Sequence, residues 1–514
     1  MNALPSGTQT RSDQATPTRW QPRQVLLLFL LAHIVVWTLL PALMHTGLPI
    51  DLVEGYAIGR EWVVGYHKHP AGPWWLIEAA RSITGAVGWP AYLISASLVA
   101  LTYWLAFLLG RDMLGERRAV AGALLLSGVM YFSWVVPEYN HNVAPMPVWL
   151  AFILALWRAR ERGSLIWWIA VGLFAALGLY AKLATILLPA LATVYMLVDV
   201  KLRASLRTAG PWLALVAFVI ASLPIMHWLY ASEFLALDYA AERSRGRAAG
   251  GVALFLGKQV ASAAGLYVLL AVALWQRPSS AGTSPEAAPS IAPDARRFLL
   301  YFLLAPILAL AALAAVSGVG LKGSWATPML SLAGLAAVAL AGSRFDATAA
   351  DRILCGAVAL LAAVPIAYAV SLRQPSTKLL TPQRTNWPQA VVAQEMQRLW
   401  REATGKPLRI VAGDLWTAGM VAAHASDKPS ILVDGSLRYS PWIDRARLQR
   451  EGFMAVWWRT REDPPDDLRP WIGTRIDGQH VFHMRGSDRK QTAIVLYTIV
   501  KPGALTEGGG PPAR

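Results

Sequence analysis

The sequence predicts an α-helical polytopic membrane protein of about eleven spans with a C-terminal α/β domain, on three observations. Apolar residues make up 55% of the 514 residues, and charged residues only 15%. Long apolar runs recur up to residue 372. The residues after 372 are polar and carry short strand-like runs instead. This balance excludes a disordered chain, a collagen-like fibre and a charge-driven nucleic-acid binder.

The formal net charge of +16 is typical of a membrane protein, because basic residues collect on cytoplasmic loops and acidic residues do not balance them. The single cysteine, Cys355, lies in an apolar run. A disulfide framework and a cysteine metal cluster are therefore excluded.

The apolar runs predict a transmembrane domain at residues 25–372. Residues 1–24 are rich in Ser, Thr, Pro and Gln and predict a disordered cytoplasmic tail. The run 25–44 is too long for a signal peptide, so we expect a retained first span. The chain is expected to reverse tightly around Lys182. Further spans are predicted at 92–110, 120–136, 144–157, 165–180, 183–198, 212–231, 252–275, 298–317, 325–342 and 353–372.

The distribution of basic residues predicts the orientation. Alternate loops carry clusters of Arg and Lys, near residues 111–118, 158–162, 201–207 and 277–297, on the same side as the Arg-bearing tail. The tail is therefore expected to be cytoplasmic, and an odd span count places residues 373–502 in the periplasm. The stretch 278–293 is expected to be a cytoplasmic linker, and 503–514 a disordered tail.

Short patterned runs predict the C-terminal α/β domain. We expect strands at 408–412, 430–433 and 453–458, helices at 415–425 and 444–449, and a closing hairpin at 480–484 and 492–500. Gly413 and Asp414 follow the first strand, but no phosphate-binding loop follows them, so we interpret them as structural.

The first outer loop, residues 46–90, carries the strongest candidates for chemistry. Asp51 and Glu54 are three residues apart and so lie on one face of a helical turn. Two such carboxylates suit a general base with an orienting group or metal ligand. Spacing alone favours the other interpretation, a capped interfacial helix with Asp51 as its N-cap. The apolar patch at 74–77, with Glu78 and Arg81 on its polar side, likewise predicts a helix at the headgroup level.

A second outer loop, at 137–142, contains Glu138, Asn140, His141 and Asn142. These side chains suit sugar hydroxyls, and a solvated turn explains them equally well. The histidines at 67, 69 and 141 lack the spacing of a metal motif, so no cofactor is certain and a divalent metal is left open.

Cations near the outer mouth are candidates for binding a lipid phosphate. Lys182 lies between two apolar spans, where a lone ammonium must pair or bind something. Arg243, Arg245 and Lys322 lie in other outer loops and are suited to phosphate. Contact with outer-leaflet headgroups explains the two arginines equally well.

Several motifs together resemble those of a known family. The first-loop segments are Asp51-Leu52-Val53-Glu54, Gly59-Arg60-Glu61-Trp62 and Gly65-Tyr66-His67-Lys68-His69-Pro70. They resemble the first periplasmic loop of GT-C glycosyltransferases of the family 39 type, in particular the lipid A and lipopolysaccharide-core galacturonosyltransferase group. The segments 138–142, 178–182 and 323–325 resemble later blocks. The chain departs from the group at Ala71, where a second proline is usual.

The resemblance implies an enzyme that moves a sugar from a polyprenyl-phosphate donor to an envelope acceptor, such as lipid A, lipopolysaccharide core or another glycolipid. It also implies a location in the bacterial inner membrane. Asp51 matches the catalytic carboxylate and Glu54 the second acidic position. Lys182, Arg243, Arg245 and Lys322 are the candidates for the donor phosphate. The candidate substrate contacts are Tyr66, His67, Lys68, His69, Glu138, Asn140, His141, Asn142 and Trp325.

The alternative class is a polytopic transporter or lipid flippase without transferase activity. That class predicts inverted internal repeats and charged residues at span midpoints. The sequence shows no repeat of its two halves, and its ionisable residues gather at the outer mouth.

Overall fold

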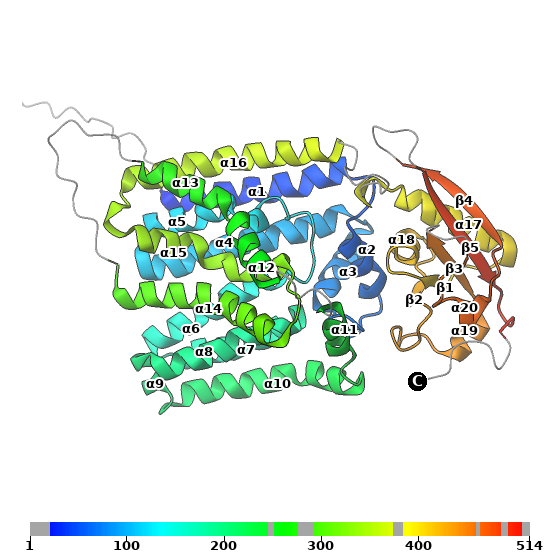
Figure 1. The fold of residues 1–514 in the computed structure, drawn as a ribbon, viewed down its shortest axis with the longest axis horizontal. Coiled ribbons are helices and arrows are strands. Elements are labelled where there is room, and N and C mark those ends of the chain that lie inside the picture. The colour runs from blue at the N-terminus through cyan, green and yellow to red at the C-terminus, as the bar shows by residue number, and fades with distance from the viewer. Residues whose placement is uncertain are drawn as a thin grey trace, which may run out of the picture.

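The computed structural model describes residues 21–244, 251–275, 291–373, 384–458, 463–484 and 492–505. It consists of an elongated helical bundle with a C-terminal α/β unit at one end (Figure 1). Most residues of the predicted tails and of the predicted linker lie outside these ranges.

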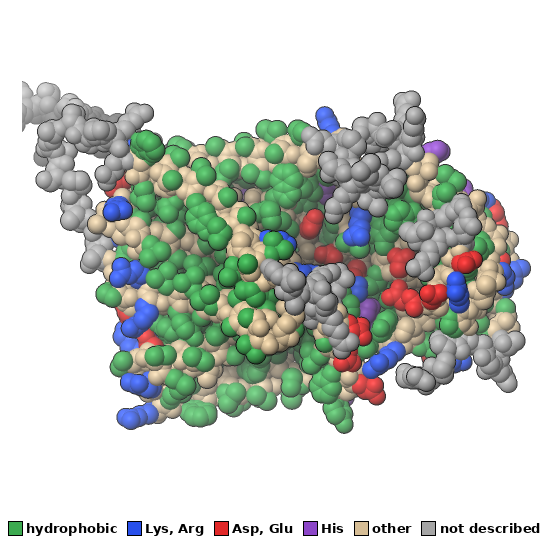
Figure 2. All heavy atoms as spheres, viewed as in Figure 1, with side chains coloured by type: hydrophobic (Ala, Val, Ile, Leu, Met, Phe, Trp, Pro, Cys, Tyr) green, Lys and Arg blue, Asp and Glu red, His purple; other side chains and the backbone are tan. Residues whose placement is uncertain are grey.

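Six helical stretches of the described chain are long and apolar enough to cross a bilayer. They are α1 (Pro22–Met44), α4 (Trp89–Leu114), α10 (Ala209–Ala231), α14 (Pro293–Ser317), α16 (Ala347–Arg373) and Gly323–Arg344, which joins η4 (Gly323–Leu332), α15 (Ala333–Ala341) and η5 (Gly342–Arg344). A seventh is the pair α12 (Gly251–Ser262) and α13 (Ala264–Leu274), bent by 47°. Hydrophobic side chains cover the bundle between its ends (Figure 2). The total of about eleven spans stays a prediction.

Besides the bent pair α12 and α13, two more of the predicted spans are broken rather than continuous helices. The run 120–136 forms α5 (Glu116–Leu125) and then the short 3-10 turns η1 (Leu126–Gly128) and η2 (Met130–Phe132). The break lies where the backbone of Gly128 approaches α13: a Cβ on Gly128 would lie 2.3 Å from the Leu266 nitrogen. The run 325–342 begins as 3-10 helix and continues as α15.

The predicted reversal at Lys182 is confirmed. This residue separates α7 (Leu165–Ala181) from η3 (Leu183–Ile186) and α8 (Leu187–Val198). At the far end of α8, Asp199 accepts a 2.9 Å hydrogen bond from Arg160, near the end of α6 (Pro145–Arg162). The chain continues through α9 (Val200–Ser205) and α10 to α11 (Leu235–Ser244).

The first outer loop folds into α2 (Ile50–Gly59) and α3 (Gly72–Thr84). The interfacial position of α3 stays a prediction, but its polar side is not exposed, because Glu78 and Arg81 are buried and bond each other at 2.6 Å. Trp74 is buried as well. The N-cap of α2 is Pro49, so Asp51 lies in the first turn and is not the cap.

The C-terminal unit is a five-stranded sheet of order β2-β1-β3-β5-β4. The strands β1 (Ile410–Gly413), β2 (Ser430–Val433) and β3 (Phe453–Trp458) are parallel, and β4 (Gly478–His483) pairs antiparallel with β5 (Thr492–Val500). These strands, and the helices α18 (Thr417–His424) and α19 (Arg445–Glu451), confirm the predicted elements within a few residues. Two helices and a 3-10 turn were not predicted: α17 (Gln389–Thr404), α20 (Arg469–Ile472) and η6 (Arg384–Asn386).

The C-terminal unit packs against α2, the helix that carries Asp51. Gly419 of α18 faces Val53 of α2, where a Cβ would meet the valine methyl at 2.9 Å. Arg60 donates to the carbonyl of Ala422 at 2.6 Å and to that of Pro429 at 2.8 Å. This contact fixes α2 between the bundle and the sheet (Figure 1).

Candidate active site

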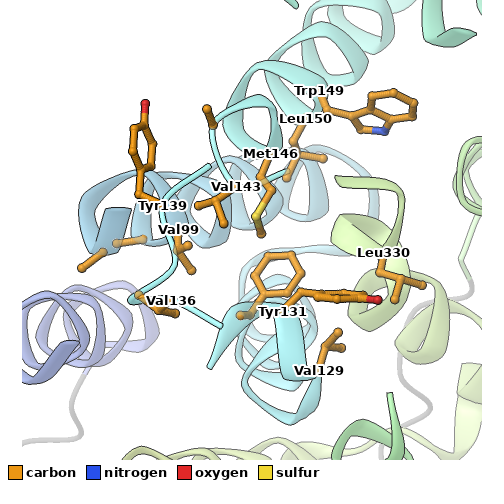
Figure 3. Close-up of a cluster of buried hydrophobic side chains, with 14 of the residues drawn as sticks. Val99, Val129, Tyr131, Val136, Tyr139, Val143, Met146, Trp149, Leu150 and Leu330 are labelled. Atoms are coloured by element: carbon orange, nitrogen blue, oxygen red, sulfur yellow. The ribbon is translucent and has the colours of Figure 1, made fainter. Parts of the chain in front are cut away.

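The loop at 137–144 packs on a cluster of buried apolar side chains. Figure 3 shows Val136, Tyr139 and Val143 among the buried residues of this cluster, together with Val99 and Met146. The Tyr139 hydroxyl also donates to the Pro73 carbonyl at 3.1 Å. The polar residues of the loop are therefore presented from a rigid base.

Asp51 meets this loop through Asn140. The Asn140 amide nitrogen donates to Oδ2 of Asp51 at 2.8 Å. The Asn140 amide oxygen accepts from the backbone of Asn142 at 2.8 Å, which fixes the orientation of the amide. Burial and the charge of Glu54 raise the pKa of Asp51, and the bond from Asn140 opposes them in part. A carboxylate with a raised pKa is suited to accept a proton.

Glu54 lies one helical turn from Asp51 and is fully engaged. Lys68 donates to its Oε2 at 2.8 Å, and the Tyr66 hydroxyl donates to Oε1. Burial would raise the pKa of Glu54, but these two partners hold it below its usual range. Glu54 is therefore a paired carboxylate that holds Lys68, and Asp51 is the carboxylate available as a base.

A tight turn brings Tyr66, Lys68 and the histidines to this place. Gly65 and Pro70 pair as an isolated bridge, and the Tyr66 nitrogen donates to the His69 carbonyl at 3.0 Å. A side chain on Gly65 would collide with the Trp228 ring at 2.4 Å, so glycine is required there. The nitrogen of Ala71 donates to Val64 at 2.9 Å, a bond that proline could not make. The departure from the family pattern thus stabilises the turn.

Two of the three predicted histidines, His69 and His141, come into contact, and His67 lies within electrostatic reach of His69. The rings of His69 and His141 are 4.3 Å apart, and Nε2 of His141 bonds the Pro70 carbonyl at 2.9 Å. Burial lowers the pKa of His67 to about 3 and that of His141 to about 4, so both are neutral at pH 7. Within the described residues, no group of three or more His, Cys, Asp or Glu could hold a metal ion.

Lys182 approaches the same loop from the membrane helices. Its Nζ donates to the Asn142 side-chain oxygen at 2.7 Å and lies 5.9 Å from the Trp325 ring centre. It makes no ion pair with any described residue. The charge of Lys322 acts on Asp51, which places this second lysine at the site.

The remaining predicted residues differ in position. The Glu138 side chain is exposed, within electrostatic reach of Asp51 and Arg384. The Arg243 side chain and all of Arg245 lie outside the described residues.

Sequence reasoning missed three residues that line this site. Lys68 lies 5.9 Å from the ring of Tyr239 in α11. The ring of Tyr439, in the C-terminal unit, stacks on His67 at 4.4 Å and 16°. Asp434 is close enough for its charge to act on Lys68. No sequence signal could find them, because they lie 170 residues or more from the first loop (from 68 to 239, 434 and 439).

The chain is similar to several known proteins. A family model described as dolichyl-phosphate-mannose-protein mannosyltransferase matches residues 68–228. The lipopolysaccharide core galacturonosyltransferase RgtA of Rhizobium johnstonii is 24% identical over 85% of this chain and 86% of its own length. An undecaprenyl phosphate-alpha-4-amino-4-deoxy-L-arabinose arabinosyl transferase of Pseudomonas fluorescens is 26% identical over 43% of this chain and 40% of its own length.

The fold is also that of a solved structure. ArnT from Cupriavidus metallidurans bound to undecaprenyl phosphate matches with a TM-score of 0.60 and 15% identity. The match covers 95% of this chain and 99% of that one. The chain therefore has the ArnT-like GT-C fold, and the resemblance to the GT-C glycosyltransferases predicted from the first-loop motifs is confirmed.

Proposed function

We propose that this chain is a membrane glycosyltransferase that moves a sugar from a polyprenyl-phosphate donor to a lipid or glycan acceptor of the bacterial envelope, with Asp51 as the base. One observation carries the proposal. Asn140 and Asn142, two residues apart, join a half-buried carboxylate to an ammonium that has no ion pair within the described part of the chain. A base and a phosphate-binding cation are the two charges that such a transfer needs.

The reaction is an inverting displacement. The acceptor hydroxyl attacks C1 of the donor sugar while its proton passes to Asp51, and the bond from C1 to the phosphate oxygen breaks with both electrons leaving on the phosphate. Lys182 and Lys322 offset the charge that develops on this leaving group. Arg243, in the last turn of α11, and Arg245 are proposed to help Lys182 and Lys322 to offset this charge.

The sugar lies between these charges. Asn140, Asn142 and Trp325 border its phosphate side, and Tyr66, His67 and Lys68 border the other. His69 and His141, whose rings are 4.3 Å apart, are proposed to contact the sugar together. Glu54 keeps Lys68 in place through the 2.8 Å ion pair. Glu138 is proposed to contact the saccharide from its exposed position.

The proposed orientation has a cytoplasmic N-terminus and the 373–502 domain in the periplasm of a bacterium with an inner membrane. Lys and Arg side chains gather at the end of the bundle opposite the C-terminal unit (Figure 2), which is typical of a cytoplasmic face. Two single cysteines in a Cys355→Ser background test this: Gln449→Cys in α19 and Arg203→Cys in α9, both exposed positions. A membrane-impermeant thiol reagent given to intact cells with a permeable outer membrane should label only Gln449→Cys. Labelling of Arg203→Cys alone would reverse the orientation.

Purified protein in detergent tests the activity itself. Radiolabelled polyprenyl-phosphate galacturonate, aminoarabinose and mannose are offered with rough lipopolysaccharide as acceptor. We expect label to enter the acceptor from at least one donor. No transfer from any donor, together with lipid translocation in reconstituted vesicles, would support the transporter class instead.

A further inference from the structure

A turn of the C-terminal unit reaches the candidate active site. It follows β2 and comprises residues 434–440. The Asp434 nitrogen donates to the Gly413 carbonyl at 2.9 Å, and the Ser440 hydroxyl accepts from Val433 at 2.8 Å. Gly435 has a φ of 63°, and a side chain there would lie 2.4 Å from the Asp467 carbonyl. The turn is therefore held in one shape by its own unit.

The turn contacts both other parts that surround Lys68. Tyr439 stacks on His67 of the first loop, and Arg438 bonds Glu233, beside α11, at 3.3 Å. Tyr239 of α11 closes the remaining side, with its ring 6.0 Å from that of His67. Three segments far apart in the sequence thus meet around one lysine.

The segments that meet around Lys68, namely the first loop at His67, the turn 434–440 and α11 at Tyr239, form one wall of the site. Two polar groups within this wall have no hydrogen-bond partner among the described residues. Nδ1 of His67 has no hydrogen-bond partner, and it is buried, since only 5% of the residue is exposed. The half-buried Asp434 carboxylate accepts no hydrogen bond from a described residue, and its charge acts on Lys68, whose ion pair is with Glu54. Asp434 also has a φ of 49°, a strained value for a residue other than glycine. A buried polar group without a partner is costly, so a ligand that bonds Nδ1 of His67 removes that cost, whereas the accessible Asp434 carboxylate has oxygens free to accept hydrogen bonds from the same ligand.

The geometry of the inverting displacement indicates which of the two substrates, donor or acceptor, contacts this wall. In an inverting displacement the nucleophile and the leaving group lie on opposite faces of the sugar carbon. The phosphate-binding candidate Lys182 is reached from Asp51 through Asn140 and Asn142, whereas Lys68 is reached through Glu54, one helical turn along α2. An acceptor on the side of Lys68 is consistent with this arrangement.

We propose that Asp434 binds hydroxyl groups of the acceptor saccharide, and that Tyr439 is a positioning residue that holds His67 for the same task. The inference rests on the proposed function and deepens it: the C-terminal unit selects the acceptor. A carboxylate accepts hydrogen bonds from sugar hydroxyls, and stacking on Tyr439 fixes the His67 ring so that Nδ1 keeps one direction.

Steady-state kinetics of the full chain test the role of Asp434. Asp434→Asn should raise the acceptor KM about tenfold or more, the effect of losing hydrogen bonds to a charged group. The donor KM should stay within about twofold of wild type. The matched control is Asp467→Asn, which removes an exposed carboxylate of the same unit. Because the charge of Asp467 raises the pKa of Asp434, its removal lowers that pKa and keeps Asp434 ionised. The control should leave both KM values unchanged.

Tyr439 is tested by a pair of variants. Tyr439→Phe keeps the ring and should retain the acceptor KM, whereas Tyr439→Ala removes the stack and should raise it. An equal effect of both would exclude the stacking role. An unchanged acceptor KM in Asp434→Asn, or a rise confined to the donor KM, would overturn the inference even if Asp51→Asn abolishes transfer.

A binding measurement makes the test independent of turnover. Rough lipopolysaccharide is titrated onto Asp51→Asn protein and onto the same protein with Asp434→Asn added, after both are shown to bind polyprenyl phosphate equally. We expect about tenfold weaker binding in the double variant. Equal affinity would refute the acceptor site, whereas failure of wild-type transfer with every donor would refute the proposed function alone.

Discussion

The bundle contains two clusters of buried charge, one at each end, and they are built in opposite ways. At the end far from the C-terminal unit, Asp199 accepts from Arg160 at 3.0 and 2.9 Å and from the Leu202 nitrogen at 3.0 Å. Arg160 also pairs with Asp294 of α14 at 3.1 Å. At the other end, Asp51 and Lys182 each bond a neutral asparagine rather than an opposite charge.

The difference separates a structural cluster from a site. Burying a charge is costly unless it is paired, so the Arg160 cluster, in which every charge has a partner, holds the ends of α6, α9 and α14 together. Asp51 and Lys182 are left able to exchange a proton or bind a phosphate. The following predictions test this contrast, from the largest effect to the smallest.

The first prediction breaks the structural cluster. Asp199→Ala leaves the Arg160 guanidinium, whose side chain is 3% exposed, without its main partner. We expect a loss of about 3 kcal/mol or more in the free energy of unfolding, as for other broken buried pairs. Thermal unfolding in detergent measures it, and turnover per folded molecule should stay near wild type. A large loss of turnover at unchanged stability would contradict the contrast.

The second prediction breaks the site. Asp51→Asn keeps the shape and the hydrogen bonding but removes the basic oxygen, so transfer should fall at least about a hundredfold. The melting temperature should stay near wild type, because no described residue is an ionic partner of Asp51 at hydrogen-bond distance. Label transfer and thermal unfolding are measured on the same preparation. Near-normal turnover by an intact Asp51→Asn protein would eliminate Asp51 as the base.

The third prediction concerns the ammonium of Lys182. Lys182→Met should weaken binding of polyprenyl phosphate about tenfold or more, since a hydrogen-bonded phosphate contact with a cation is lost. Lys182→Arg should keep part of the affinity, because a guanidinium also pairs with phosphate in a different geometry. Donor affinity and melting temperature are compared side by side. A fall in melting temperature with unchanged donor affinity would make Lys182 a structural residue.

The fourth prediction is a shift of the pH profile. The base must be ionised, so transfer is lost as the pH falls through the raised pKa of Asp51. Glu54 contributes to that raised pKa, and Glu54→Gln removes its charge. The acidic limb of kcat/KM should therefore move to lower pH. Glu402→Gln, an exposed carboxylate on α17, serves as the control and should leave the limb in place. A shift to higher pH would mean that Glu54 does not act on Asp51 by charge.

The sequence predicted most of the secondary structure because apolar period and length carry it directly. The strand at 430–433 and the closing hairpin were found in this way, as was the reversal at Lys182. The breaks at 126–132 and 323–332 could not be predicted, because they depend on backbones far apart in the chain approaching each other, as Gly128 and Gly265 do.

The sequence by itself determined the class of fold, the first-loop carboxylates and the loop at 138–142, since local spacing and family motifs specify them. Tertiary structure alone decided which carboxylate is free. Lys68 and Tyr66 engage Glu54, while Asp51 bonds Asn140, 89 residues away in the chain, and forms no direct ion pair with a described residue. It also brought Asp434 and Tyr439 to Lys68 and His67. Pairing and burial of charges depend on contacts between distant segments, and no local pattern of residues encodes them.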